Sequence, residues 1–505
     1  MKKFLKKLLL VIVILVVLGF LAIKYQIRDR HPGYTFHKKI EGKTTGQIKA
    51  GFAAVSITPE IVDTWNDIDK NAKYEPEKGD TFNDNNNNGE FDAFWIAGFH
   101  NRRAANGVHD SLWARTIIID DETSRIALVA IDAIGFLNDQ VIEIREKLSD
   151  KLKVDYCMVA STHVHESPDL IGIWGESEFK TGINEEYMEF VIAQVVKSVE
   201  VAVADIEPVS LHFAKDKNSA MMLVKDTRKP IVHDPGIYIL QAKRFDGTTK
   251  GTLITWANHP ETLWSKNLLI TSDFPHYFRE GIENRLGGTC VYFNGAIGGL
   301  MTTHPTTAII HPVSGKEIFE PGFEKAEAQG EILANIATQA ILNSSDSINK
   351  GAIQLEAKTF TVPFNNTMFR LASVIGLLDR GTTGRWKVRT EMAAFKIGPA
   401  SFLTIPGEIY PEIVNGGIIA PEGRDFEIEP VEVPAIRSKM PGKYKFIIGL
   451  ANDELGYIIP KSEWDNEEPW LFNSESDFYG EGNSTGPETA PIIHKIAMEL
   501  LNDLN

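Results

Sequence analysis

Short apolar runs alternate with helical patterns along most of this chain of 505 residues. The runs are rich in Ile, Val, Leu and Phe and end in polar residues, which is typical of buried strands. They cover residues 117–120, 126–131, 156–160, 237–242, 253–256, 290–293 and 402–405. Apolar residues with helical spacing occur at 141–152, 186–204, 323–342 and 492–504. This alternation predicts an α/β fold, with mixed β-sheets flanked by helices.

The region 49–505 is expected to form one large domain. It shows no internal repeat of fixed period, and no linker rich in Pro or Ser divides it. Its two cysteines, Cys157 and Cys290, lie in apolar runs. Two cysteines cannot form a disulfide framework, so buried thiols are expected.

The N-terminal segment is apolar and preceded by lysines. Residues 8–23 contain no charged side chain, and four lysines stand before them. This pattern predicts an uncleaved signal anchor at residues 1–24, a single transmembrane helix with its lysines on the cytoplasmic side. Residues 25–48 are then a polar stalk, and the large domain lies outside the cell membrane. The alternative is a cleaved signal peptide.

Charge is distributed very unevenly along the chain. The first 30 residues carry seven lysine or arginine residues and one acid, a net charge of +6. Since the whole chain has a net charge of −16, the remainder carries −22. So acidic a body is not expected to bind nucleic acid through phosphates. It is also repelled by anionic membrane surfaces unless it is tethered.

Two histidines follow one of the predicted strands. The segment Thr162-His163-Val164-His165 comes directly after the run at 156–160. On extended backbone, side chains two residues apart point to the same side, so both imidazoles would face one spot. Imidazole is the commonest metal ligand, but a catalytic zinc usually has three protein ligands. The alternative is a polar strand end whose two rings are simply hydrogen-bonded.

Two further polar groups stand where predicted strands end. His259 follows the run at 253–256, and Glu408 follows the run at 402–405. Taken singly, each is explained as a loop histidine or a solvated turn residue. Because α/β folds place ligands at strand ends, His163, His259 and Glu408 together resemble a His/His/carboxylate zinc set.

An asparagine-rich segment has the spacing of a calcium loop. Oxygen-bearing side chains occupy its positions 1, 3, 5 and 9, and a glycine occupies position 6. The candidate Ca²⁺ ligands are Asp84, Asn86, Asn88 and Asp92. Position 12 is Trp95 rather than the usual bidentate glutamate, so a flexible surface loop is the alternative.

Over about residues 50–500 the sequence resembles the neutral/alkaline, non-lysosomal ceramidases. Its segments GFAAVSITP and GVHDSLWAR are similar to the family patterns G-x-A-x-x-D-I-T-P and G-x-H-x-x-L-x-A-R. Further matches are THVHESP to T-H-T-H-S-G-P, the pair His259-Pro260 with TSD at 271–273, IPGE to V-P-G-E, and a late tyrosine block, NDELGYI. The blocks occur in the family order.

The resemblance implies a role for each matched residue. His163, His259, Glu408 and Tyr457 would hold Zn²⁺, and His165 would lie beside it as a group that transfers a proton or stabilises an oxyanion. Tyr457 could alternatively donate a hydrogen bond. Asp273 is expected to orient a ligand histidine from behind, with Asp132 as the other candidate. Arg228 is a candidate for orienting the substrate, and a solvated loop charge is its alternative.

Two features depart from the family. Its serine block, N-x-G-D-x-S-P-N, corresponds here to NGAIGGLM, so Gly299 occupies the serine position and Ile297 that of the acid. A serine nucleophile at this position is excluded, whereas a mechanism using zinc-bound water is not. The second departure is length, because ceramide-cleaving members carry an additional immunoglobulin-like domain at the C-terminus.

Three functions follow from these observations. The first is an anchored, zinc-dependent amidohydrolase, a single large zinc-hydrolase domain that cleaves the N-acyl amide bond of ceramide-like lipids. The second keeps the zinc hydrolase but takes another small amide or ester as substrate. The third is a non-catalytic metal-binding scaffold.

Overall fold

Three five-stranded sheets form the body of the protein. The computed structural model describes residues 2–476 and 479–504. In the first sheet the strand order is β8 (Tyr156–Ser161), β7 (Arg125–Ile131), β6 (Trp113–Asp120), β3 (Lys49–Ser56) and β9 (Glu207–Pro208). In the second it is β13 (Thr289–Asn294), β12 (Thr249–Trp256), β11 (Ile237–Lys243), β10 (Ser210–Asp216) and β16 (Ser347–Ile348). In the third it is β1 (His37–Glu41), β18 (Ile353–Pro363), β19 (Lys387–Ile397), β20 (Ala400–Thr404) and β22 (Tyr444–Ile448).

Each of these sheets is antiparallel except for one pair at an edge. The parallel pairs are β7 with β8, β12 with β13, and β20 with β22. Parallel strands need a crossover connection. The first is made by α2 (Asn138–Lys147) and the second by α4 (Phe274–Leu286), whereas the third contains α7 (Pro411–Asn415) and α8 (Ile436–Lys439). These three edges position the site described below.

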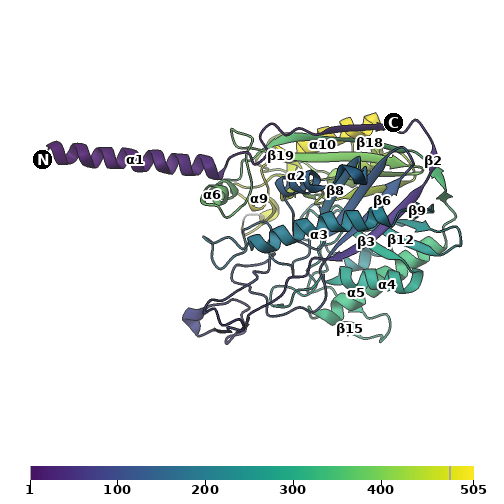
Figure 1. The fold of residues 1–505 in the computed structure, drawn as a ribbon, viewed down its shortest axis with the longest axis horizontal. Coiled ribbons are helices and arrows are strands. Elements are labelled where there is room, and N and C mark those ends of the chain that lie inside the picture. The colour runs from purple at the N-terminus through teal and green to yellow at the C-terminus, as the bar shows by residue number, and fades with distance from the viewer. Residues whose placement is uncertain (1, 477–478, 505) are drawn as a thin grey trace.

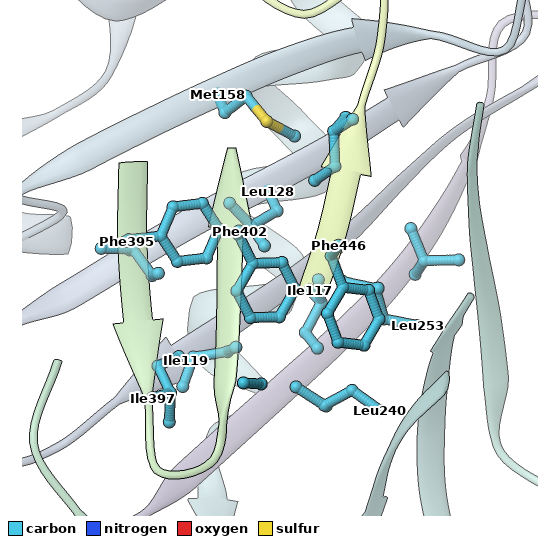
Figure 2. Packing of buried hydrophobic residues seen from close by; sticks show 14 of the residues in the cluster. Ile117, Ile119, Leu128, Met158, Leu240, Leu253, Phe395, Ile397, Phe402 and Phe446 are labelled. Atoms are coloured by element: carbon cyan, nitrogen blue, oxygen red, sulfur yellow. The ribbon is translucent and has the colours of Figure 1, made fainter. Parts of the chain in front are cut away.

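The inner faces of the three sheets share one hydrophobic core. Figure 2 shows Phe395, Phe402 and Phe446 of the third sheet close to Ile117 and Leu128 of the first. Leu240 and Leu253 of the second sheet belong to the same cluster. Because both faces of β7 and β8 are covered, these strands are apolar along their whole length. This explains why the sequence identified them as continuous runs rather than alternating ones.

Helices cover the outer faces of the sheets (Figure 1). The helices α2 and α3 (Glu185–Ala204) pack on the first sheet, α4 and α5 (Phe323–Leu342) on the second, and α10 (Thr489–Asp503) on the third. The predicted α/β fold of mixed sheets flanked by helices is therefore confirmed. The predicted helix at 141–152 is wrong at its end, since α2 stops at Lys147. Ser149 is extended and accepts a hydrogen bond from the Lys151 N–H, which starts a separate 3-10 turn (Asp150–Leu152).

The remaining elements are short. Two-stranded pairs join β2 (Gly46–Gln47) to β17 (Lys350–Gly351), β4 (Thr64–Asn66) to β5 (Thr81–Asn83), β14 (Ile309–Ile310) to β15 (Glu317–Ile318), and β21 (Glu408–Ile409) to β23 (Tyr457–Ile458). The helix α6 (Thr367–Ile375) lies beside the end of the N-terminal helix α1 (Lys2–Gln26) (Figure 1), and a further short helix is α9 (Tyr479–Gly482). Further 3-10 turns are Pro76–Lys78, Met221–Leu223, Lys461–Glu463 and Leu471–Asn473.

The N-terminal helix projects away from the body, but the segment after it does not. Within the described residues, α1 is the one helix long and apolar enough to span a membrane, at a mean hydropathy of 2.9. The segment predicted as a stalk contributes β1, which pairs with β18 from His37 opposite Lys358 to Glu41 opposite Gln354. The alternating polar residues of β1 are those of an edge strand with one face in solvent, which composition alone cannot distinguish from a linker.

Candidate metal centre

The carboxyl ends of the three sheet edges meet at one point. His163 follows β8, His259 follows β12, and Glu408 follows β20. Tyr457 joins them because β21 and β23 pair in parallel, with Glu408 directly opposite Tyr457. The three strand ends that the sequence singled out are therefore neighbours in space, and so is the tyrosine.

The ligand atoms lie within a few ångströms of one another. The Glu408 Oε2 atom is 3.0 Å from His259 Nε2 and 3.4 Å from His163 Nε2. The Tyr457 hydroxyl lies 3.4 Å from His259 Nε2. Each of His163, His165 and His259 offers one ring nitrogen within 4.8 Å of the others, and all three are buried. This cluster has the size and composition of a metal site.

Backbone carbonyls fix the tautomers of two histidines. His163 Nδ1 donates to the Ile134 carbonyl at 2.6 Å, and His259 Nδ1 donates to the Met301 carbonyl at 2.7 Å. With Nδ1 bonded to a carbonyl, Nε2 is the ring atom of each histidine that faces Glu408: it donates to the carboxylate when the ring is protonated and offers a lone pair to a cation when the ring is neutral. Such an outer hydrogen bond is typical of metal-ligating histidine. His165 has no hydrogen-bond partner at either ring nitrogen among the described residues.

The backbone at His163 differs from the prediction. Extended backbone was expected to bring His163 and His165 to one side, but His163 has a φ of 67°, in the left-handed region. A non-glycine residue there costs of the order of 1 kcal/mol and needs support. The support comes from the His163 N–H, which donates to the Ala133 carbonyl at 2.9 Å. The two rings still meet, with centroids 4.9 Å apart, but through this turn rather than through strand alternation.

Burial and neighbouring charges shift the pKa values of these groups in different directions. Burial would raise the pKa of Glu408, but the charges and hydrogen bonds of His163 and His259 lower it to about 2. Burial would lower the pKa of His259, but its hydrogen bond and ion pair with Glu408 raise it overall. Burial and the neighbouring charges of His163, His259 and Arg103 hold the pKa of His165 well below its ordinary value. Glu408 is thus anionic and His165 neutral.

The cluster opens into a pocket with mainly apolar walls. The buried residues His163, Glu408 and Tyr457 line the end that we call the floor, and His259, which contacts Glu408, is counted with them. The four apolar or aromatic lining residues that keep contact with solvent form what we call the mouth: Ile173, Trp174, Phe369 and Tyr479. Between them the lining includes Ile134, Ile171, Phe364, Leu378 and Leu455. An acyl chain is the kind of ligand that such walls accommodate.

Three residues of the site were missed by sequence reasoning. Glu261 Oε2 lies 3.4 Å from His165 Nδ1, and its place two residues after His259 was an available signal. Arg380 lines the pocket and forms a two-pronged ion pair with Asp453, at 2.7 and 2.6 Å. Tyr479 also lines it, with its ring centroid 6.0 Å from that of Tyr457. No local pattern marked Arg380 or Tyr479.

The backbone of the altered serine block, residues 294–301, holds His259 in position through hydrogen bonds. Gly299 has a φ of 76°, and a Cβ there would lie 3.1 Å from Asp226 Oδ1. The same segment provides the Met301 carbonyl, which accepts hydrogen bonds from both the backbone N–H and the Nδ1 of His259. Residues 294–301 therefore shape the floor through backbone groups.

Asp273 and Arg228 lie behind the site. Asp273 is the N-cap of α4 and accepts from the Phe274 N–H, while both ligand histidines use carbonyls as their outer partners. Asp132, the other carboxylate considered for this role, pairs with Arg279. Arg228 pairs with Glu481 at 2.6 Å and stacks over the ring of Tyr410. Since Tyr410 contacts Tyr457, Arg228 is one layer away from the floor.

The four candidate calcium ligands lie together on an exposed loop. Asp84 accepts from the N–H groups of Asn88 and Gly89, at 3.1 and 2.9 Å. Asp92 Oδ2 accepts from the side-chain amides of Asn86 and Asn88, at 2.7 and 2.8 Å. These contacts are those of a compact turn, and calcium binding stays a prediction.

Comparison with known proteins places the fold among solved ceramidases. No family model matches the sequence. The structure is similar to the crystal structure of neutral ceramidase from Pseudomonas aeruginosa, with a TM-score of 0.63 and 15% identity, over 91% of this chain and 74% of that one. It is also similar to a ceramidase complexed with C2, with a TM-score of 0.65 and 14% identity, over 91% of this chain and 75% of the other. At this identity the likeness shows a shared fold.

Proposed function

We propose that this chain is a membrane-anchored, zinc-dependent amidohydrolase that cleaves the N-acyl amide bond of ceramide-like lipids. The observation that carries the proposal is the convergence of His163, His259 and Glu408 on the floor of an apolar pocket. The fold that the chain shares with solved ceramidases supports the substrate class.

The residues of the floor fit a zinc ion. Carbonyls accept from Nδ1 of His163 and His259, so that Nε2 of each ring faces the Glu408 carboxylate, at 3.4 and 3.0 Å. Without a cation each Nε2 needs a proton to bond this buried carboxylate, and a bound cation can replace those protons. Two imidazoles and a carboxylate are a common ligand set of catalytic zinc, and Tyr457 is placed to be a fourth ligand.

The side chains around the floor are suited to different steps of amide hydrolysis. When bound, zinc would polarise the substrate carbonyl and lower the pKa of water, so that hydroxide is available as the nucleophile at neutral pH. His165 is neutral, and among the described residues neither of its ring nitrogens has a hydrogen-bond partner, so it can stabilise the oxyanion or move a proton to the leaving nitrogen. Glu261, 3.4 Å from His165 Nδ1, is placed to orient that ring. The apolar walls hold the acyl chain and exclude water.

The N-terminal helix supports an anchored enzyme. Residues 3–25 of the candidate span are all exposed, as expected of a helix that is surrounded by lipid. Its lysines place the N-terminus in the cytoplasm and the body outside the cell membrane. A cleaved signal sequence is the alternative.

A second candidate substrate is another small amide or ester. The observation in its favour is Gly299, which removes the hydroxyl that the resemblance expects in the serine block. The third candidate, a non-catalytic metal-binding scaffold, is an outcome of the test below.

The test compares the full chain with His163→Ala and with His212→Ala as a matched control. His212 lies on β10 and bonds to the Ser210 hydroxyl, away from the floor. Zinc is measured by elemental analysis, and cleavage with a fluorogenic N-acyl-sphingosine. About one zinc per chain with cleavage, both lost only in His163→Ala, is expected. Bound zinc without cleavage of this lipid would indicate another substrate. A wild-type protein that binds no zinc would refute the proposal that the chain is a zinc-dependent enzyme. A truncation at residue 45 is unsuitable because it removes β1.

A further inference from the structure

We infer that the exposed face of α6 docks into the surface of the membrane that α1 spans. This face consists of Met368, Leu371 and Ile375, whose side chains are 68%, 49% and 45% exposed. The spacing of three and four residues puts them on one side of the helix. A helix on a soluble body normally turns such residues inward, so three apolar side chains in a row on the solvent side indicate a further contact surface.

The last turn of α1 is attached to the chain around α6. The side-chain amide of Gln26 packs on Gly376, so closely that a Cβ there would lie 3.0 Å from its nitrogen. The Ile27 carbonyl accepts from the backbone N–H and the hydroxyl of Thr382, at 3.1 and 2.8 Å. Figure 1 shows α6 beside the end of α1 where the body begins. If α1 spans the bilayer, α6 lies at its surface.

Two ion pairs keep the helix and the body in this arrangement. Arg30 pairs with Asp379 at 2.8 Å, and the largely buried Arg389 pairs with Asp29 at 2.7 Å. Both join the residues directly after α1 to the segment that follows α6. The distance between the membrane and α6 is therefore set by folded structure rather than by a flexible stalk.

The surroundings of α6 have the composition of a membrane interface. The Arg370 guanidinium lies over the ring of Trp386, 5.2 Å from its centroid, and Lys387 beside it is exposed. Aromatic rings and basic side chains favour the headgroup region. Phe179, 79% exposed, is carried by a neighbouring loop, in which Thr181 donates to the Leu377 carbonyl. A local basic and aromatic surface on an acidic body favours an anionic bilayer as the occupant.

The opposite face of α6 belongs to the pocket. Phe369 lines the mouth, and its ring lies 6.2 Å from that of Phe364 in the wall. A docked α6 therefore brings the mouth to the bilayer surface. This step rests on the proposed function: a lipid substrate could then pass from the bilayer along Phe369 to the floor without crossing water.

The direct test is the depth of a label at position 371. The native cysteines are buried, so a thiol-reactive, environment-sensitive fluorophore labels Leu371→Cys selectively in the full chain. Val313→Cys is the matched control, an apolar residue 81% exposed between β14 and β15. In bilayer nanodiscs containing phosphatidylglycerol, the label at 371 is expected to shift to the blue and to be quenched by doxyl lipids. The label at 313 is expected to be quenched by aqueous iodide alone.

Two other results would overturn the inference. One is equal iodide quenching at 371 and 313. The other is a blue shift at 371 that occurs in detergent and grows with protein concentration, because a second copy of the chain would then cover α6. Neither result depends on catalysis, so the inference and the proposed function can fail separately.

A functional arm tests delivery of the substrate. Leu371→Asp is expected to lower turnover of a bilayer-embedded N-acyl lipid several-fold and to leave turnover of a short, water-soluble amide unchanged. Val313→Asp should change neither rate. Equal loss on both substrates would indicate damage to the fold and would contradict a docking role.

Discussion

The floor and the mouth of the pocket differ in how they are built. The floor is buried and polar, and its ligands come from three sheet edges joined by a common core. The mouth is apolar and partly exposed, and it is built by α6, the start of α9 and a loop. Reaction chemistry requires fixed polar groups, whereas recognition of a lipid chain requires only apolar area of suitable shape. Substitutions at the two ends should therefore affect different kinetic constants.

The largest effect is expected at the carboxylate of the floor. Glu408→Gln removes the charge that faces His163 and His259, so zinc should be lost and kcat should fall by at least about 10³-fold. Elemental analysis and steady-state kinetics on the same samples measure both.

Glu454→Gln is the matched control for the metal content. Burial and the charge of Glu408 raise the pKa of Glu454 well above its ordinary value, so its environment favours a neutral side chain, which glutamine supplies. Zinc retained in Glu408→Gln, or lost equally in both variants, would contradict the assignment.

His165→Ala is expected to separate catalysis from metal binding within the floor. Its ring nitrogens have no hydrogen-bond partner among the described residues, and its proposed role is in the transition state. We expect kcat to fall by about 10²–10³-fold with zinc retained. Loss of zinc along with activity would show that His165 is a ligand instead.

A pH effect is expected at the base of the mouth. Asp169 accepts from the N–H groups of Ile171, Gly172 and Trp174, each at 2.8 Å, and burial raises its pKa to about 6. The folded state thus binds this proton more tightly than the unfolded state. The resulting stability is fully present below the unfolded pKa of roughly 4 and is lost as the pH rises through about 6.

Asp169→Asn should remove that part of the pH dependence. The change in the free energy of unfolding between these pH values should be smaller in the variant by about 3 kcal/mol. Denaturant titrations of both proteins at about pH 4, 5, 6 and 7 measure this difference in the free energy of unfolding over the range in which the group titrates. Parallel curves for the two proteins would contradict the assignment.

The smallest effect is expected at the mouth itself. Phe369→Ala removes apolar contact that substrate and transition state share, so KM for a long-chain substrate should rise about tenfold with kcat unchanged. Phe245→Ala, an exposed phenylalanine in the turn between β11 and β12, is the control. A fall in kcat at constant KM would show that the mouth participates in chemistry.

Most of the floor, but not the mouth, could be predicted from the sequence. Strand ends are local features, so His163, His259 and Glu408 could be identified from the apolar runs before them. Tyr457 came from the resemblance and has no local signal of its own, and Arg380 and Tyr479 were not identified. The mouth was not predicted, because half-buried apolar residues on a short helix resemble ordinary core positions.

The sequence by itself determined the α/β elements, the apolar N-terminal helix and the polar groups at three strand ends, because each depends on neighbouring residues alone. The tertiary structure decided that these ends meet, since His259 and Glu408 are 149 residues apart. It also decided the left-handed turn at His163, the carbonyl partners of the histidines, the pairing of β1 with β18, and the position of α6 beside α1. These features depend on which sheet edges and surfaces pack together, and contacts between distant segments leave no periodic pattern in the chain.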